Sequence, residues 1–155
     1  MKKISLVIVV ILMAGLAHAQ ELKVSEVPAS VKESFTKRFP NAKEVKWSKE
    51  SATEFEAEFE SGEMEQSANF DQTGKWLVTE TEIKKLDLPE AVLITITKEF
   101  PGYKVEEAEK GETFDAGIFY EAELEKGKLK YEVQFSGDGK ILKKEELKEK
   151  GKSKD

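Results

Sequence analysis

The stretch FEAEFESGEMEQSANF, residues 55–70, alternates apolar and acidic side chains with few interruptions. Successive side chains of a β-strand point to opposite faces, so this pattern predicts strands with one apolar and one acidic face. Ser61 and Gly62 lie near the middle, and glycine tolerates the positive φ that a tight hairpin turn requires. The stretch is therefore expected to be a β-hairpin whose apolar side faces the core.

The same hairpin pattern occurs a second time in the chain. FEAEFESGEMEQSANFDQTGKWL (55–77) is echoed by YEAELEKGKLKYEVQFSGDGKIL (120–142), and VPASVKESFTKRFPNAK (27–43) by LPEAVLITITKEFPGYK (88–104). Two copies of this length indicate a duplicated unit. The second copy has a longer predicted loop, EKGETFDAG (109–117), between its first two strands.

Each copy opens with the pattern of a helix. Apolar residues recur at every fourth position from Val27 to Phe39, which places them on one stripe of a helix. Pro28 suits the helix start, and Pro40 lies just past the end. In the second copy, VLITIT (92–97) is β-branched and by itself favours a strand, but the repeat favours a helix.

The predicted fold class is α+β: two tandem repeats, each one helix packed on a four-stranded antiparallel meander. The predicted segments are a signal peptide (1–19), a first repeat (20–84), a second repeat (85–147) and a charged tail (148–155).

The N-terminus predicts export. MKK is followed by an apolar run and by Ala17-His18-Ala19, the small-x-small pattern of a signal-peptide cleavage site. The run is too short for a stable membrane span, and no cysteine follows it that could carry a lipid anchor. We expect cleavage near Ala19, a periplasmic or secreted protein, and no membrane anchor.

Composition excludes several classes of site. His18, inside the predicted signal peptide, is the only histidine, and there is no cysteine. Zinc, copper and haem sites usually need imidazole or thiolate ligands, and Ser–His or Cys–His catalysis needs those side chains. The net charge of −6 disfavours nucleic acid. We therefore expect no cofactor, no metal centre, no nucleic-acid partner and no catalytic residues.

The two copies of [VL]P-x-x-V…FP-x-x-K…F-x-x-x-G-K in an exported chain resemble the PepSY-like proteins of Bacteroidetes-type bacteria, a family described as β-lactamase-inhibitor-like. The resemblance spans about residues 24–147. It implies a periplasmic tandem α+β protein, with a role in restraining proteases or other exported enzymes. It supplies no catalytic motif.

The acidic face is the first candidate site. A turn at Ser61-Gly62 would set Glu60 against Glu63 and Glu58 against Glu65, while the second copy carries lysines at the positions of Glu63 and Glu65. Like charges directly opposite are destabilising. The face is then either solvated surface or a site for a basic partner or a divalent cation. A flat strand does not converge the oxygens that calcium needs, which favours a basic protein. The acidic candidates are Glu56, Glu58, Glu63 and Glu65.

Three aromatic residues are further candidates. Trp47 and Trp76 are either core residues or interface contacts, because tryptophan is common in both. Phe114 lies between glycines in the predicted long loop, where it either anchors a partner or covers the helix.

The expected function is a periplasmic, non-catalytic binding module for another exported protein or peptide, with an inhibitor or modulator role. The alternative is binding of a small ligand or cation between the two repeats. A hydrolase that uses paired carboxylates is the third hypothesis, and it needs a cleft that holds both groups.

Overall fold

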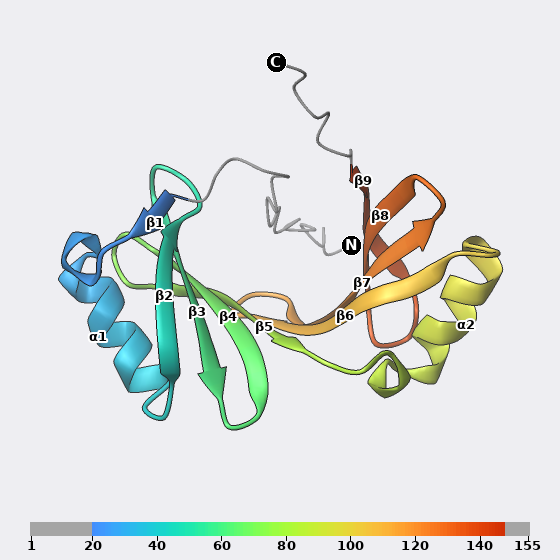
Figure 1. The fold of residues 1–155 in the computed structure, drawn as a ribbon. Coiled ribbons are helices and arrows are strands. Elements are labelled where there is room, and N and C mark those ends of the chain that lie inside the picture. The colour runs from blue at the N-terminus through green and yellow to red at the C-terminus, as the bar shows by residue number, and fades with distance from the viewer. Residues whose placement is uncertain (1–19, 148–155) are drawn as a thin grey trace, which may run out of the picture.

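The computed structural model describes residues 20–147, so the predicted signal peptide and charged tail lie outside the described residues. Nine strands form a single antiparallel sheet in the order β1 to β9, and two helices pack against it (Figure 1). The elements are β1 (Gln20–Leu22), α1 (Ala29–Arg38), β2 (Lys43–Lys49), β3 (Glu54–Ser61), β4 (Met64–Asp71), β5 (Trp76–Glu82), α2 (Glu90–Glu99), β6 (Lys104–Thr113), β7 (Gly117–Lys126), β8 (Leu129–Phe135) and β9 (Ile141–Leu147), with 3₁₀ turns at Val24–Glu26 and Lys85–Asp87.

The prediction of two repeats, each one helix on its own four-stranded meander, is wrong. Every strand from β1 to β9 is hydrogen-bonded to its neighbours in the chain, including β5 to β6 across the expected boundary. The physical reason is edge pairing. Two separate sheets would leave the backbone groups of β5 and β6 unpaired at exposed edges, and joining them satisfies those groups.

The segment that makes the join is the expected long loop. Residues 109–113 continue β6 and pair with β5 from Thr113 opposite Val78 to Glu109 opposite Glu82. Gly111 lies within this stretch, and the Phe119 ring occupies the space where a β-carbon at Gly111 would lie. The extra residues of the second copy are therefore strand, and they continue the sheet from one copy into the other.

Both helices pack on the same face of the sheet. Val31 and Phe35 of α1 contact Trp47, Phe59 and other apolar residues of β2 to β4 in one core. A second core contains apolar residues of α2 and of β6 to β8: Val92, Ile96, Ala108, Ala122, Leu124, Val133 and Phe135. Within residues 20–147, neither helix has the length and apolar character needed to cross a bilayer.

The β4–β5 turn contacts the first half of α1, and the β8–β9 turn contacts the first half of α2. Gly139 adopts φ +83°, and a β-carbon there would lie 2.4 Å from the carbonyl oxygen of Ala91. Thr95 donates its hydroxyl to the Gly139 carbonyl at 2.8 Å. Gly74 has the corresponding contact with Ser30. Glycine is required at these positions both by its φ and by the close approach of the helix backbone.

The register of the first hairpin differs from the expected one by two residues. Ser61 pairs with Met64 and Glu60 with Glu65, so the turn residues are Gly62 and Glu63. Gly62 has φ +69°. A two-residue turn with a positive φ at its first position selects glycine there, which explains why Gly62 begins the turn rather than ending it.

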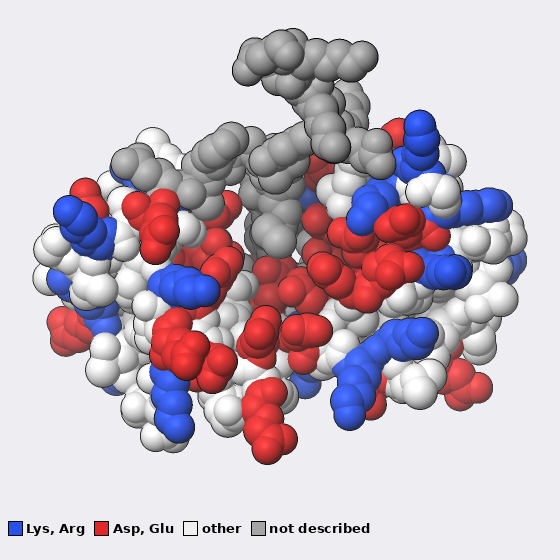
Figure 2. Space-filling view, viewed as in Figure 1, with Lys and Arg blue, Asp and Glu red and all other residues white. Residues whose placement is uncertain are grey.

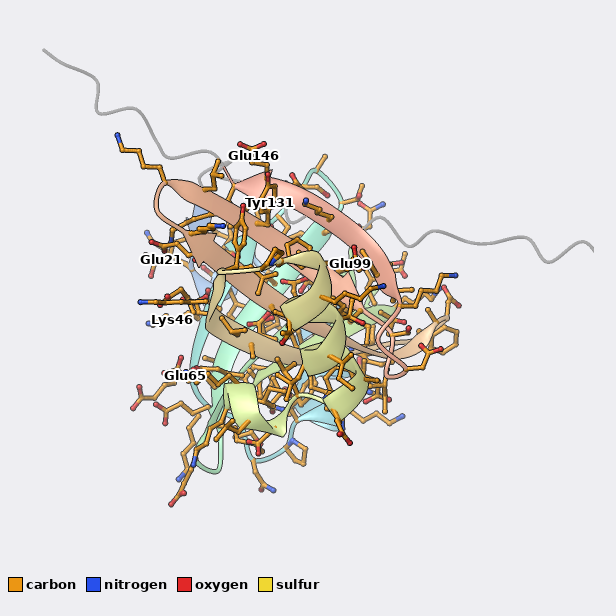
Figure 3. All side chains as sticks on the ribbon, turned by 90° about the vertical axis from the view of Figure 1, so that its right-hand side faces the viewer. Glu21, Lys46, Glu65, Glu99, Tyr131 and Glu146 are labelled. Carbon is orange, nitrogen blue, oxygen red and sulfur yellow. The ribbon has the colours of Figure 1, made fainter. Side chains whose placement is uncertain are left out.

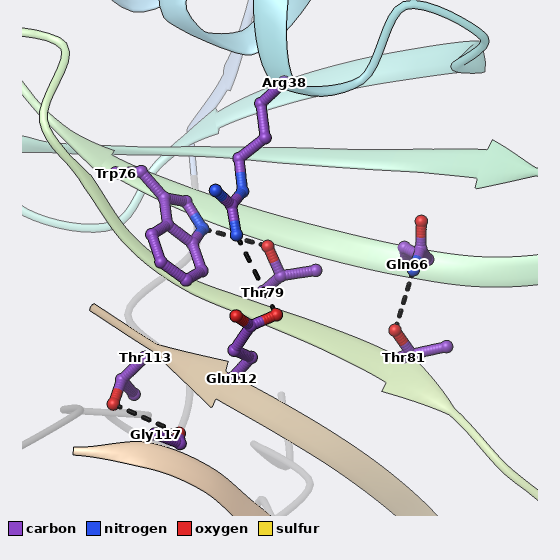
Figure 4. A network of polar contacts seen from close by, with 8 residues as sticks. All are labelled: Arg38, Gln66, Trp76, Thr79, Thr81, Glu112, Thr113 and Gly117. Atoms are coloured by element: carbon purple, nitrogen blue, oxygen red, sulfur yellow. Dashed lines mark hydrogen bonds and ion pairs between the residues drawn. The ribbon is translucent and has the colours of Figure 1, made fainter. Parts of the chain in front are cut away.

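On the helix side, Arg38 connects the two copies (Figure 4). Its guanidinium carbon lies 3.5 Å from the centre of the Trp76 ring, and Nη2 lies 3.8 Å from Glu112 Oε2 on β6. Trp76 donates its indole N–H to the Thr79 hydroxyl at 2.9 Å. The ion pair is exposed and contributes little by itself, but the stacked guanidinium covers β5 close to its pairing with β6.

Candidate functional site

The face of the sheet opposite the helices carries most of its acidic side chains. Antiparallel pairing keeps side chains of opposed residues on the same face, so the register Lys46–Glu58–Ser67–Glu80 runs straight across it. Figure 2 shows carboxylates gathered over the middle of the molecule. We call this surface the acidic face; its carboxylates on β3 to β8 include Glu54, Glu56, Glu58, Glu60, Glu65, Asp71, Glu80, Glu82, Glu107, Glu109, Glu121, Glu123, Glu125 and Glu132.

The acidic face is hollowed. A cavity of about 340 Å³ lies over β2 to β6, and carboxylates supply more than half of its lining residues. Side chains of the face lie along one side of the molecule, where Figure 3 labels Glu21, Lys46 and Glu65, while Glu99 of α2 lies away from them. The hollow therefore presents negative charge on the side that α1 and α2 leave uncovered.

At the centre of the acidic face, three carboxylates converge from three consecutive strands. Glu80 of β5, Glu109 of β6 and Glu121 of β7 each place an oxygen within 4.8 Å of the others. Glu80 is 3% exposed and Glu121 is 5% exposed, and Glu109 is half-buried. We call these three residues the central carboxylates. At this spacing two ionised carboxylates repel by about 3 kcal/mol at an effective dielectric constant of 20.

Burial controls the protonation of this cluster. Burial, together with the negative charges of Glu109 and Glu121, raises the pKa of Glu80 to about 8. Burial raises the pKa of Glu121 to about 7, although a hydrogen bond from the Gln134 amide at 2.8 Å opposes the shift. Burial likewise raises the pKa of Glu109. Charged carboxylates lose their hydration here, which favours the protonated form.

An aromatic side chain forms one wall of the cluster. Phe119 alternates with Glu121 on the same face of β7, and its ring fills the space above Gly111, the residue opposite Glu80. Phe119 is itself buried. The ring adds apolar surface beside Glu80 in the sheet, and burial is the largest cause of the raised pKa values of Glu80 and Glu121.

Away from the centre, the carboxylates have partners. Lys130 places its ammonium 2.8 Å from Glu123 and 3.1 Å from Glu125. Lys143 lies 4.0 Å from Glu132. Glu56 accepts a hydrogen bond from the Ser48 hydroxyl at 3.1 Å, yet burial raises its pKa to about 7.

The structure separates the four acidic candidates. Glu58 and Glu65 are exposed on the acidic face, and Glu56 is half-buried on it. Glu63 is an exposed turn residue and opposes no strand residue, so the expected pairing of Glu60 with Glu63 is wrong. Glu60 opposes Glu65 instead.

The observed register also changes the comparison with the second copy. Glu125 opposes Lys130, just as Glu60 opposes Glu65 in the first copy. Lys128 lies in the turn of its own hairpin, outside the strand pairing. Of the two lysines that the first copy lacks, only Lys130 is therefore a strand residue, and Glu65 takes its position in the first copy.

The aromatic candidates lie in different environments. Trp47 is 5% exposed and packs its ring 5.1 Å from Phe35, so it is a core residue and not a surface contact. Trp76 is half-buried beneath Arg38. Phe114 is 65% exposed beyond the end of β6, with Lys75 Nζ 4.9 Å from its ring centre.

Sequence reasoning missed the central carboxylates. The alternation TETE (79–82) of β5 continues the pattern of the first hairpin, and Glu121 begins the second one. Glu109, however, falls in the segment interpreted as a loop, so no strand register could be assigned to it. The signal was the acidic alternation on every strand, which only the pairing of β5 with β6 brings together.

Carboxylates this close can catalyse glycoside hydrolysis when one of them has a raised pKa. Here a sugar ring would have to touch Glu80 and Glu121, which are almost fully buried. The arrangement suits a small ion or protons better than an organic substrate.

The comparison with protein families agrees with the tandem motifs. A family model described as "Putative beta-lactamase-inhibitor-like, PepSY-like" matches residues 15–66 and 53–143, most of the chain. The chain belongs to the PepSY-like family. The resemblance carried by the helix and turn motifs is thereby confirmed. None of the curated proteins matches this PepSY-like chain.

Solved structures share the PepSY-like fold at low identity. A DUF2874 family protein of Bacteroides uniformis is 21% identical, with a TM-score of 0.71 over 77% of this chain and 89% of that chain. A BLIP-like protein of Bacteroides fragilis is 24% identical, with a TM-score of 0.68 over 82% and 92%. A protein of Bacteroides eggerthii described as a putative periplasmic protein is 19% identical, with a TM-score of 0.71 over 77% and 88%. At these identities the likeness concerns the fold.

Proposed function

We propose that this PepSY-like protein is a periplasmic, non-catalytic binding module that engages a basic surface of another exported protein or peptide, as an inhibitor or modulator. The family description as β-lactamase-inhibitor-like supports such a role, and the description of a similar structure as periplasmic supports the compartment. The signal-like N-terminus agrees with export.

The observation that carries the proposal is the single hollowed acidic face. Two separate sheets would offer two small faces, whereas the β5–β6 pairing creates one surface from β1 to β9. The helices pack on the other side, so the acidic face is accessible to a partner as far as residues 20–147 describe it. A broad curved face lined by carboxylates is complementary to a convex surface rich in lysine or arginine.

The rim of the hollow supplies the partner contacts. Glu58, Glu65, Glu82 and Glu107 are exposed, so their charges remain available to a partner. Such charges accelerate encounter and select partners, and their effect falls with ionic strength. Phe114, exposed beyond β6, is proposed as an additional aromatic anchor.

Charge reversal at the rim is expected to weaken partner binding strongly. Glu58→Lys combined with Glu65→Lys should weaken the binding of a partner, isolated from periplasmic extract at low salt, by at least about tenfold. The measurement is isothermal titration calorimetry with the purified partner at two salt concentrations. Glu65→Lys places lysine opposite Glu60, as Lys130 lies opposite Glu125, whereas Glu58→Lys places lysine opposite Lys46. The favourable and unfavourable pairs should largely offset each other, so the fold should be retained.

The matched control makes the same change of charge on the helices. Glu33→Lys with Glu99→Lys alters exposed residues of α1 and α2, the helices that pack on the opposite side of the sheet. The control is expected to bind like the unmodified protein. Equal loss in both double variants would indicate a net-charge effect, and no loss in either would exclude the acidic face as the binding surface.

A further inference from the structure

The central carboxylates are arranged like the ligands of an ion. Glu80, Glu109 and Glu121 reach one point from three adjacent strands, and one oxygen of each lies within 4.8 Å of the other two. Glu109 of β6 opposes Glu121 of β7 directly. Glu80 of β5 opposes Gly111, two residues beyond Glu109 on β6, so Glu80 and Glu109 are diagonal neighbours on the same face. The bent, hollowed sheet thus converges oxygens that a flat strand could not.

An independent observation shows that one oxygen atom of the cluster lacks a hydrogen-bond partner. Glu80 is only 3% exposed to solvent. Its Oε1 atom is buried and has no hydrogen-bond partner among the described residues. Buried polar atoms are normally paired, because an unpaired one loses its hydration without compensation. The groups that act most strongly on Glu80 are themselves acids: Glu109, Glu121, Glu56 and Glu132. The charges that act on Glu80 are therefore negative, whereas Lys143 partly offsets the negative charge at Glu121.

We propose that the central carboxylates bind a hard divalent cation of the size of Ca²⁺ at the junction of β5, β6 and β7. Ca²⁺ takes oxygen ligands at about 2.3–2.6 Å, so two ligands on opposite sides of it are about 4.6–5.2 Å apart. The carboxylate oxygens already fit within this span. Mg²⁺ requires shorter contacts in near-ideal octahedral geometry and gives up its water reluctantly, so a cluster of three carboxylates on separate strands suits the more adaptable coordination of Ca²⁺ better.

The surroundings allow the ion to enter and to complete its coordination. Glu109 is half-buried and lines the 340 Å³ cavity together with Glu80, so this cavity connects the site to the hollow. A second cavity of about 100 Å³ contacts Glu109, Glu121 and Glu132. Water in these spaces and the carboxylate of Glu132 can supply the remaining ligands, since Ca²⁺ takes six to eight.

Binding would also strengthen the junction between the two copies. The ligands belong to strands on both sides of the β5–β6 pairing, so a bound ion would cross-link the first copy to the second. Ligands that bind only the folded state raise its stability by mass action. This inference does not depend on the proposed partner protein.

The test is the melting temperature of chelator-treated protein at pH 8, with and without 1 mM CaCl₂. We expect Ca²⁺ to raise Tm by about 5–10 °C, MgCl₂ to raise it less, and NaCl of equal ionic strength to leave it nearly unchanged. Calorimetric titration should give a single site with a Kd on the order of 10⁻⁴ M, a range found in extracellular calcium modules.

Two variants separate the site from general screening of an acidic surface. Glu80→Gln should abolish the Ca²⁺-induced shift while raising Tm in the absence of Ca²⁺, because it removes a buried charge. Glu65→Gln, an exposed residue of the same face, should leave the shift intact. If Glu80→Gln does not fold, Glu109→Gln provides the same comparison at a half-buried position. No shift with Ca²⁺, or an equal shift in the Glu65 and central variants, would overturn the proposal.

Discussion

Raising the pH from 5.5 to 8.5 is expected to destabilise the protein by about 3 kcal/mol in the presence of a chelator. The folded-state pKa is about 8 for Glu80 and about 7 for Glu121 and Glu132, whereas the reference value is 4.5. Between these values the native state holds protons that the unfolded state has released, so stability falls as pH rises. This contribution is complete below about pH 4.5 and is lost as pH rises through 7–8.

Other charged groups around the cluster also affect the size of this change. Glu56 and Glu109 titrate near the cluster with raised pKa values, and Lys143 partly offsets the shifts of Glu121 and Glu132. Because these groups are coupled, their shifts do not add. The measurement is urea unfolding at several pH values between 5 and 9.

The control for the pH profile is a variant that cannot ionise at the centre. Glu80→Gln should flatten the profile and make the protein more stable than the unmodified chain at pH 8.5. Glu65→Gln, exposed on the same face, should leave the slope unchanged. A stability that is constant or increases from pH 5.5 to 8.5 would contradict the raised pKa values.

Gly139→Ala is expected to destabilise the protein by about 3–4 kcal/mol. Its β-carbon would lie 2.4 Å from the Ala91 carbonyl oxygen, an atom of the α2 backbone that cannot move alone. The φ of +83° adds the strain of a left-handed alanine. The substitution therefore separates the turn from the helix and weakens the Thr95 hydrogen bond to Gly139.

Gly117→Ala is the matched control for the effect of φ. Gly117 has φ +79°, but a β-carbon there would meet nothing within 4 Å. This variant should lose only about 1–2 kcal/mol, the backbone strain alone. Chemical unfolding of both variants measures the difference. Equal losses would show that the contact between the turn and α2 contributes no stability.

The repeat made local structure predictable where intrinsic propensity failed. VLITIT (92–97) is β-branched, yet residues 90–99 form α2, as the alignment with the first copy indicated. Its Val92 and Ile96 are buried at the spacing of one helical stripe. Tertiary packing onto the sheet outweighs the small intrinsic preference of these residues for strands.

Turn geometry was predicted only in part. Gly62 and Gly127 lie in the hairpin turns, as expected. The register depends on whether glycine is the first or the second residue of the two-residue turn, and the sequence did not show which. An error of two residues preserves the face of every side chain, because strand side chains alternate with a period of two. The acidic and apolar faces were therefore assigned correctly although the pairs Glu58–Glu65 and Glu60–Glu63 were not.

The sequence by itself determined the two helices, the alternation that separates an apolar from an acidic side, and the membership of the PepSY-like family. These properties depend on local spacing, which a sequence displays directly. Only the tertiary structure decided that β5 and β6 pair, that residues 109–113 are strand, and that Glu80, Glu109 and Glu121 meet. That pairing satisfies backbone groups at two free edges, and backbone hydrogen bonding does not depend on side-chain identity, so the side-chain pattern carries no signal for it.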